Sequence, residues 1–97
     1  MSAAPAPVRI LLVDDHFVVR SGLAASLGLE DDLQVVAEAG SAAEALTACA
    51  AHTPDVVIMD LQLGEVNGIT CTEQLGQAHP GIRIMVFSSF ARDEDVY

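Results

Sequence analysis

The chain has 97 residues, 52% hydrophobic and 19% charged, which gives room for one small packed domain and no second one. Its 14 acidic residues outnumber 4 basic residues, all arginine, and a net charge of −10 predicts no direct nucleic-acid binding by this chain and repulsion from anionic membranes. No apolar run is long enough for a membrane span and no secretory signal opens the chain, so we expect a cytoplasmic protein.

The pattern of apolar residues divides the chain into alternating elements. Residues 1–7 predict a disordered lead-in, and the remaining residues 8–97 form the domain. Short runs rich in apolar and β-branched residues predict strands at 8–13, 33–37, 55–59 and 82–87. Helices are predicted at 17–29, 41–52 and 68–78, a loop at 61–67, and a first helical turn at 92–97.

Local signals support these helices. The first has an apolar stripe and a possible N-cap at Asp15; the stripe comprises Phe17, Val18, Leu23, Ala24 and Leu27. The second opens on Ser41 and Glu44, which have the spacing of a capping box. Cys49 and Cys71 are expected to be reduced, packed thiols.

Alternation of strands with helices predicts an α/β fold with a parallel sheet covered on both faces. In such sheets ligands bind beyond the carboxyl ends of the strands. Asp14 and Asp15 follow the first strand, Asp60 follows the third, and Ser88 and Ser89 follow the fourth. If the first and third strands are neighbours, three carboxylates converge on one patch.

Such a patch needs a cation. Two carboxylates about 4 Å apart repel by roughly 4 kcal/mol at an effective dielectric constant near 20, and three pairs approach the stability of a whole domain. Oxygen ligands suit Mg²⁺ or Mn²⁺. No histidine is expected to contribute: His16 is assigned to the first helix, and His52 and His79 to helix ends.

A carboxylate beside a divalent cation, with a hydroxyl nearby, is a constellation for phosphoryl transfer. In this interpretation Asp60 is the nucleophile that accepts the phosphoryl group. Asp14 and Asp15 hold the metal, and Ser88, or less readily Ser89, donates a hydrogen bond to the transferred group.

Three segments resemble the receiver domain of two-component response regulators. They are ILLVDDH (10–16), PDVVIMDLQLGEVNG (54–68) and the end of IRIMVFSS (82–89), in that order and spacing. DDHFVVRSGL (14–23) is similar to the subfamily with a LuxR-type helix-turn-helix output domain. The resemblance implies a flavodoxin-like fold with strand order 2-1-3-4-5, and transcriptional control through an output domain outside this chain.

The resemblance also implies residue roles. Asp60 would receive phosphate from a sensor histidine kinase, and the protein would be a switch and not an enzyme. Asp15, Asp60 and the backbone carbonyl of Gln62 would ligate Mg²⁺, with Asp14 acting through water. Ser88 would be the hydroxyl that moves toward the phosphate.

The chain departs from the family pattern in three ways. First, the fifth strand with its lysine and the fifth helix are missing, so the receiver is expected to be incomplete. Second, the switch aromatic of that strand is absent, and Tyr97 comes too early to be it. The third departure lies in the loop after Asp60. Gly64 stands where the family usually has proline. The strand at 82–87 would then be an open apolar edge, which predicts either self-association or segment swapping through that edge, or a natural protein that is longer than this chain. Without the lysine, phosphorylation from a small acyl phosphate would be slow or absent.

Two other functions remain open. An Mg²⁺-dependent phosphatase with an aspartate nucleophile would usually carry a second aspartate two positions after Asp60, where this chain has Gln62. A phosphorylation-incompetent interaction or ligand-binding domain is the other alternative. A nucleotide cofactor is not expected, because the chain has no glycine-rich phosphate-binding loop.

Overall fold

The computed structural model describes residues 6–63 and 66–87. Four strands form one parallel sheet in the order β2-β1-β3-β6. They are β1 (Val8–Val13), β2 (Leu33–Ala39), β3 (Val56–Asp60) and β6 (Arg83–Phe87). The predicted strand order is therefore confirmed for these four strands. The expected first helical turn at 92–97, and residues 1–5 of the expected lead-in, lie outside the described residues.

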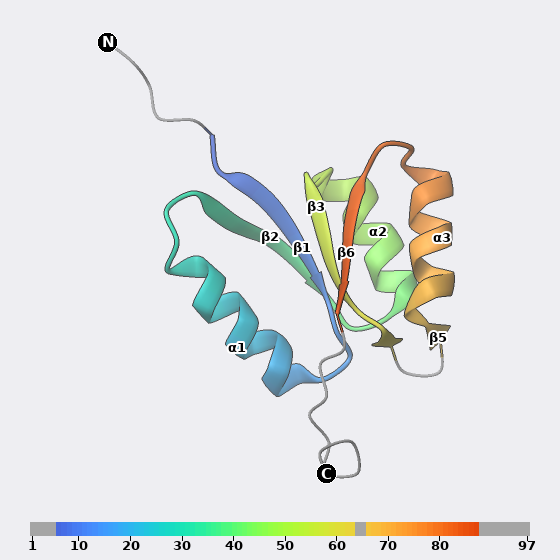
Figure 1. Ribbon diagram of the computed structural model, residues 1–97, viewed down its shortest axis with the longest axis horizontal. Coiled ribbons are helices and arrows are strands. Elements are labelled where there is room, and N and C mark those ends of the chain that lie inside the picture. The colour runs from blue at the N-terminus through green and yellow to red at the C-terminus, as the bar shows by residue number, and fades with distance from the viewer. Residues whose placement is uncertain (1–5, 64–65, 88–97) are drawn as a thin grey trace.

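Three helices cover the two faces of the sheet: α1 (Phe17–Gly28), α2 (Ala42–His52) and α3 (Gly68–Ala78). Figure 1 shows α1 on one side of the sheet and α2 and α3 on the other. Among the described residues, none of the helices combines the length and the apolarity that a membrane crossing requires.

The main core lies between the sheet and the pair α2 and α3. Alternate residues of the central strands face it, including the fully buried Leu11, Val13, Val57 and Met59. Cys49 and Cys71 are buried free thiols in this core, as predicted, and burial raises the pKa of both.

The capping box of α2 is confirmed, whereas two expectations about α1 are wrong. Ser41 Oγ accepts a hydrogen bond from the backbone N–H of Glu44 at 3.1 Å. The N-cap of α1 is His16 and not Asp15, with no side-chain cap. Phe17 and Val18 are 68% and 80% exposed, because the sheet-facing stripe of α1 consists of its later residues.

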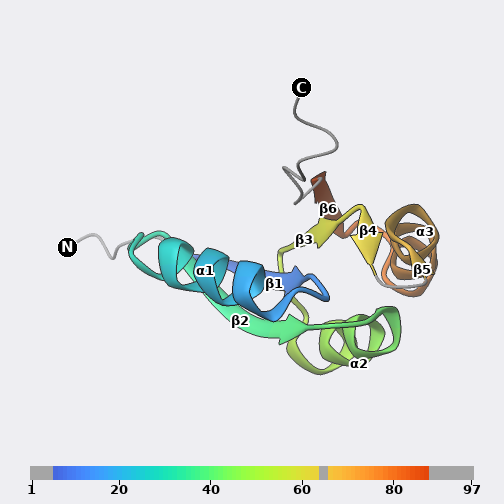
Figure 2. The same ribbon diagram turned by 90° about the horizontal axis from the view of Figure 1, so that it is seen from below.

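The expected loop at 61–67 is also wrong in part. It contains a small antiparallel pair, β4 (Gln62–Leu63) with β5 (Val66–Asn67). Two-residue strands are too short for an alternating pattern to reveal. The pair lies beside the start of α3 (Figure 2) and leads the chain from the end of β3 into that helix.

Candidate functional site

The register of the two central strands brings the predicted carboxylates together. Val13 of β1 pairs with Met59 of β3. The next residue along the chain is an aspartate in both cases, Asp14 directly after β1 and Asp60 as the last residue of β3, so the two lie side by side at the carboxyl edge of the sheet. Asp14 is 1% exposed and Asp60 is 0% exposed, while the side chain of Asp15 is 30% exposed.

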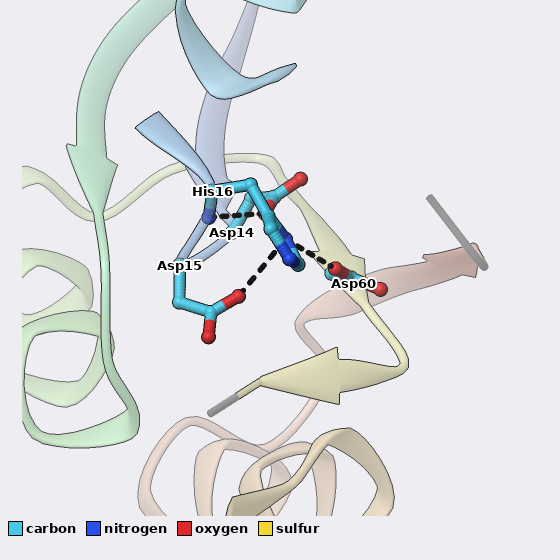
Figure 3. A group of neighbouring side chains, drawn as sticks. All are labelled: Asp14, Asp15, His16 and Asp60. Carbon is cyan, nitrogen blue, oxygen red and sulfur yellow. Dashed lines mark hydrogen bonds and ion pairs between the residues drawn. The ribbon is translucent and has the colours of Figure 1, made fainter. Parts of the chain in front are cut away.

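His16 joins this cluster, contrary to the expectation that no histidine contributes. Its Nδ1 lies 3.0 Å from Asp14 Oδ1, 3.1 Å from Asp15 Oδ1 and 3.6 Å from Asp60 Oδ2. Figure 3 shows the ring between the Asp14–Asp15 turn and Asp60. Because His16 is the N-cap, it lies outside the regular helix and its side chain leaves the same turn as the two aspartates.

The turn that carries these residues is held by local hydrogen bonds. Asp14 Oδ1 accepts from the backbone N–H of His16 at 2.8 Å. Arg20, one helical turn further on, donates through Nη1 to the backbone carbonyl of Asp14 at 2.7 Å and through Nε to Glu38 at 3.0 Å. The segment D-D-H-x-x-x-R therefore contains the hydrogen-bonding groups that hold its own turn in place.

The charges in the cluster act on His16. The hydrogen bond to Asp14 raises the pKa of the imidazole, desolvation opposes that change, and the charges of Asp15, Asp14 and Asp60 raise it further. The negative charge gathered at this edge therefore favours the protonated form of the ring when no ion is bound.

The donor set fits a divalent metal ion. The ligand atoms of Asp14, Asp15, His16 and Asp60 all lie within 4.8 Å of one another. Asp14 Oδ2 is buried and has no hydrogen-bond partner among the described residues. Buried polar atoms normally have partners, so this oxygen marks a place where an ion or its water shell fits.

The other predicted site residues are placed only in part. Gln62 opens β4, two residues after Asp60. Ser88 and Ser89 lie outside the described residues, as does Gly64. Phe87, the residue before Ser88, pairs with Asp60 in the sheet, and its carbonyl accepts from the backbone N–H of Leu61 at 2.6 Å.

Comparison with known proteins agrees with this geometry. Residues 10–97 match the response regulator receiver domain. The chain belongs to this family. The receiver is 44% identical over 87 residues to the DNA-binding transcriptional activator DevR/DosR of Mycobacterium tuberculosis, covering 90% of this chain and 40% of that protein. It thus spans less than half the length of this curated relative.

Solved structures of receivers share the fold. A LuxR-family two-component response regulator from Aurantimonas superimposes with a TM-score of 0.82 at 39% identity, covering 88% of this chain and 61% of that one. The signal receiver domain of the NarL response regulator of Mycobacterium tuberculosis gives 0.80 at 30% identity, covering 96% and 75%. The flavodoxin-like receiver fold and the LuxR-type relationship are therefore confirmed.

Proposed function

We propose that this receiver accepts a phosphoryl group on Asp60 from a sensor histidine kinase, in a reaction that depends on Mg²⁺. The observation that carries the proposal is the register that seats buried Asp60 beside Asp14, within reach of Asp15. A carboxylate in this setting can attack phosphorus while neighbouring acids hold a cation.

The chemistry is the transfer of a phosphoryl group from a nitrogen or oxygen donor to a carboxylate oxygen of Asp60. A carboxylate oxygen of Asp60 forms a bond to phosphorus, and the bond from phosphorus to the donor breaks. The donor, the imidazole of a phosphohistidine or the carboxylate of a small acyl phosphate, leaves with the electron pair. A bound Mg²⁺ would neutralise charge on the phosphoryl oxygens.

The residues of this chain divide the remaining work. Asp15, Asp60 and the backbone carbonyl of Gln62 would hold the ion, and Asp14 would act on it through water. Ser88 donates a hydrogen bond to the transferred phosphoryl group. The pairing of Phe87 with Asp60 supports this role, because Ser88 directly follows Phe87.

The test is labelling by a small acyl phosphate with and without Mg²⁺, read by intact mass and peptide mapping. Because the chain has no lysine to assist the transfer, the expected result is slow labelling by one phosphoryl group on Asp60, dependent on Mg²⁺ and absent from Asp60→Asn. Asp31→Asn, at an exposed turn far along the chain from the site, is the matched control and should label normally. Labelling of Asp60→Asn to the wild-type extent would refute the assignment.

We propose that the whole protein is a switch that controls transcription in the cytoplasm through a DNA-binding output domain outside this chain. The relative named as a DNA-binding transcriptional activator supports this, as does a net charge of −10, which disfavours DNA contact by the receiver itself. A switch predicts no turnover of a generic phosphate ester. Sustained hydrolysis that Asp60→Asn abolishes would favour a phosphatase.

Self-association through β6 is part of the proposal. In the described sheet β6 is an edge strand, and Met85 and Val86 are 60% and 41% exposed. Such an edge can pair with a second copy. Light scattering should find a dimer that Val86→Lys converts to a monomer; a wild-type monomer at high concentration would contradict the pairing.

A further inference from the structure

We propose that His16 is a nitrogen ligand of the metal site and gives it a preference for divalent transition ions such as Mn²⁺ and Co²⁺ over Mg²⁺. This inference rests on the proposed function for the existence of the site, and it goes beyond that function by assigning a fourth ligand and a different metal preference.

The spacing of the donor atoms suits a shared ion. Around an ion with ligands at about 2.1 Å, neighbouring ligands of an octahedron lie about 3.0 Å apart. His16 Nδ1 lies 3.0 Å from Asp14 Oδ1 and 3.1 Å from Asp15 Oδ1, with Asp60 Oδ2 slightly further at 3.6 Å. In the absence of an ion these are hydrogen-bond and ion-pair distances, and they place the ring nitrogen among the carboxylate oxygens that would surround the ion.

The position of the ring is built by the backbone of the turn. The His16 backbone N–H is held by Asp14, and the His16 carbonyl accepts the backbone N–H of Arg20 at 2.9 Å. Arg20 in turn fixes the Asp14 carbonyl. Because the backbone of His16 is held on both sides, only the rotation of its side chain remains to be restricted when it binds an ion, which favours coordination.

The exposure of His16 fits the tautomer that coordination needs. When Nδ1 gives its lone pair to a metal, the ring proton resides on Nε2. The His16 side chain is 51% exposed, whereas the Asp14 and Asp60 side chains are almost fully buried. The outer part of the ring can therefore meet solvent while Nδ1 faces the acids.

The chemistry of the ligand set determines the preference. Imidazole suits first-row transition ions, whereas Mg²⁺ prefers oxygen ligands and retains water. Three carboxylates alone would favour Mg²⁺ or Mn²⁺, and one nitrogen adds affinity mainly for the transition ions. As a separate observation, Asp14 Oδ2 is buried without a hydrogen-bond partner among the described residues, which leaves it available to a cation or its water shell.

The test compares metal affinities of the purified protein with those of His16→Gln, by calorimetric titration of Co²⁺, Mn²⁺ and Mg²⁺. The variant should lose about tenfold or more in Co²⁺ affinity, since even indirect supports of a ligand are worth that much, while Mg²⁺ affinity changes far less. Pulsed electron paramagnetic resonance of bound Mn²⁺ should show nitrogen coupling in the wild type and none in the variant. His52→Gln, at the end of α2 and remote from the cluster, is the matched control.

Three results would overturn the inference. Equal losses for Co²⁺ and Mg²⁺ would mean that His16 acts only on the shape of the turn. A gain in Mg²⁺ affinity would mean that the ring competes with the ion. Absence of nitrogen coupling to bound Mn²⁺ in the wild type would show that His16 does not coordinate the ion. Labelling of Asp60 by an acyl phosphate with Mg²⁺ is read separately, so failure of the proposed function is distinguishable from failure of this inference.

Discussion

Gly68, the first residue of α3, is the position where one added methyl group should do most damage. A Cβ built there would lie 2.6 Å from the carbonyl oxygen of Asp60, 2.7 Å from that of Leu61 and 2.9 Å from Leu61 Cα. All three are backbone atoms, and favourable contacts between heavy atoms lie near 3.5 Å. The Gly68→Ala variant must therefore push the end of β3 and the start of α3 apart.

The expected cost follows from two opposing effects. Overpacking of this kind destabilises by about 1–3 kcal/mol, and backbone neighbours place it toward the upper end. The reduced freedom of the unfolded chain returns less than about 1 kcal/mol. A net loss of about 2 kcal/mol corresponds to a drop in melting temperature on the order of 10 °C for a domain of this size.

The assay is thermal and urea unfolding of Gly68→Ala beside Gly76→Ala. Gly76 lies in the same helix, is exposed and has no atom within 4 Å of a built Cβ, so alanine there should stabilise by about 0.5–1 kcal/mol. Cation binding should also weaken in Gly68→Ala, because the Asp60 carbonyl moves. Equal stability of the two variants would refute the steric reasoning.

Three further predictions concern capping, packing and charge. Ser41→Ala should lower the free energy of unfolding by about 1 kcal/mol because the Glu44 N–H loses its acceptor, and an unchanged urea midpoint would contradict the cap. Leu75→Ala, at a fully buried position, should lose about 2–5 kcal/mol, visible as a lower midpoint; a loss under about 1 kcal/mol would show that the site is not packed. In the presence of a chelator, the raised pKa of His16, caused first by its bond to Asp14, should stabilise the protein below about pH 6.5 and cease to do so as the pH rises through the raised value. The stability difference between wild type and His16→Gln should therefore shrink with rising pH, and a constant difference would exclude this linkage.

The strands and the carboxylates were predictable because each depends on a local pattern with a geometric consequence. Buried parallel strands are continuous apolar runs. Asp14 follows β1 and Asp60 ends β3, so the two carboxylates are adjacent once β1 and β3 are neighbours. The capping box was likewise readable from Ser41 and Glu44. These features follow from the positions of residues along the strands and at the helix start, and predicting them does not require knowing where any other side chain points.

The role of His16 was not predictable from the same patterns. A helical stripe assigns each residue to a face of the helix, but an N-cap residue has non-helical backbone angles, here φ −93° and ψ 103°, and points elsewhere. Its position directly after two strand-end aspartates was the available signal. The β4–β5 pair escaped for another reason, since two residues per strand carry no periodicity.

The pairing of β1 with β3 links the stability of the fold to the binding of cations. Asp14 and Asp60 come from the two central strands, so the acidic cluster forms only when those strands are paired. The unfolded chain therefore lacks it. A divalent ion that bound this cluster only in the folded state would add about 2.7 kcal/mol to the stability of that state at one hundred times its dissociation constant. The lifetime of this small domain would accordingly follow the ionic composition of its surroundings.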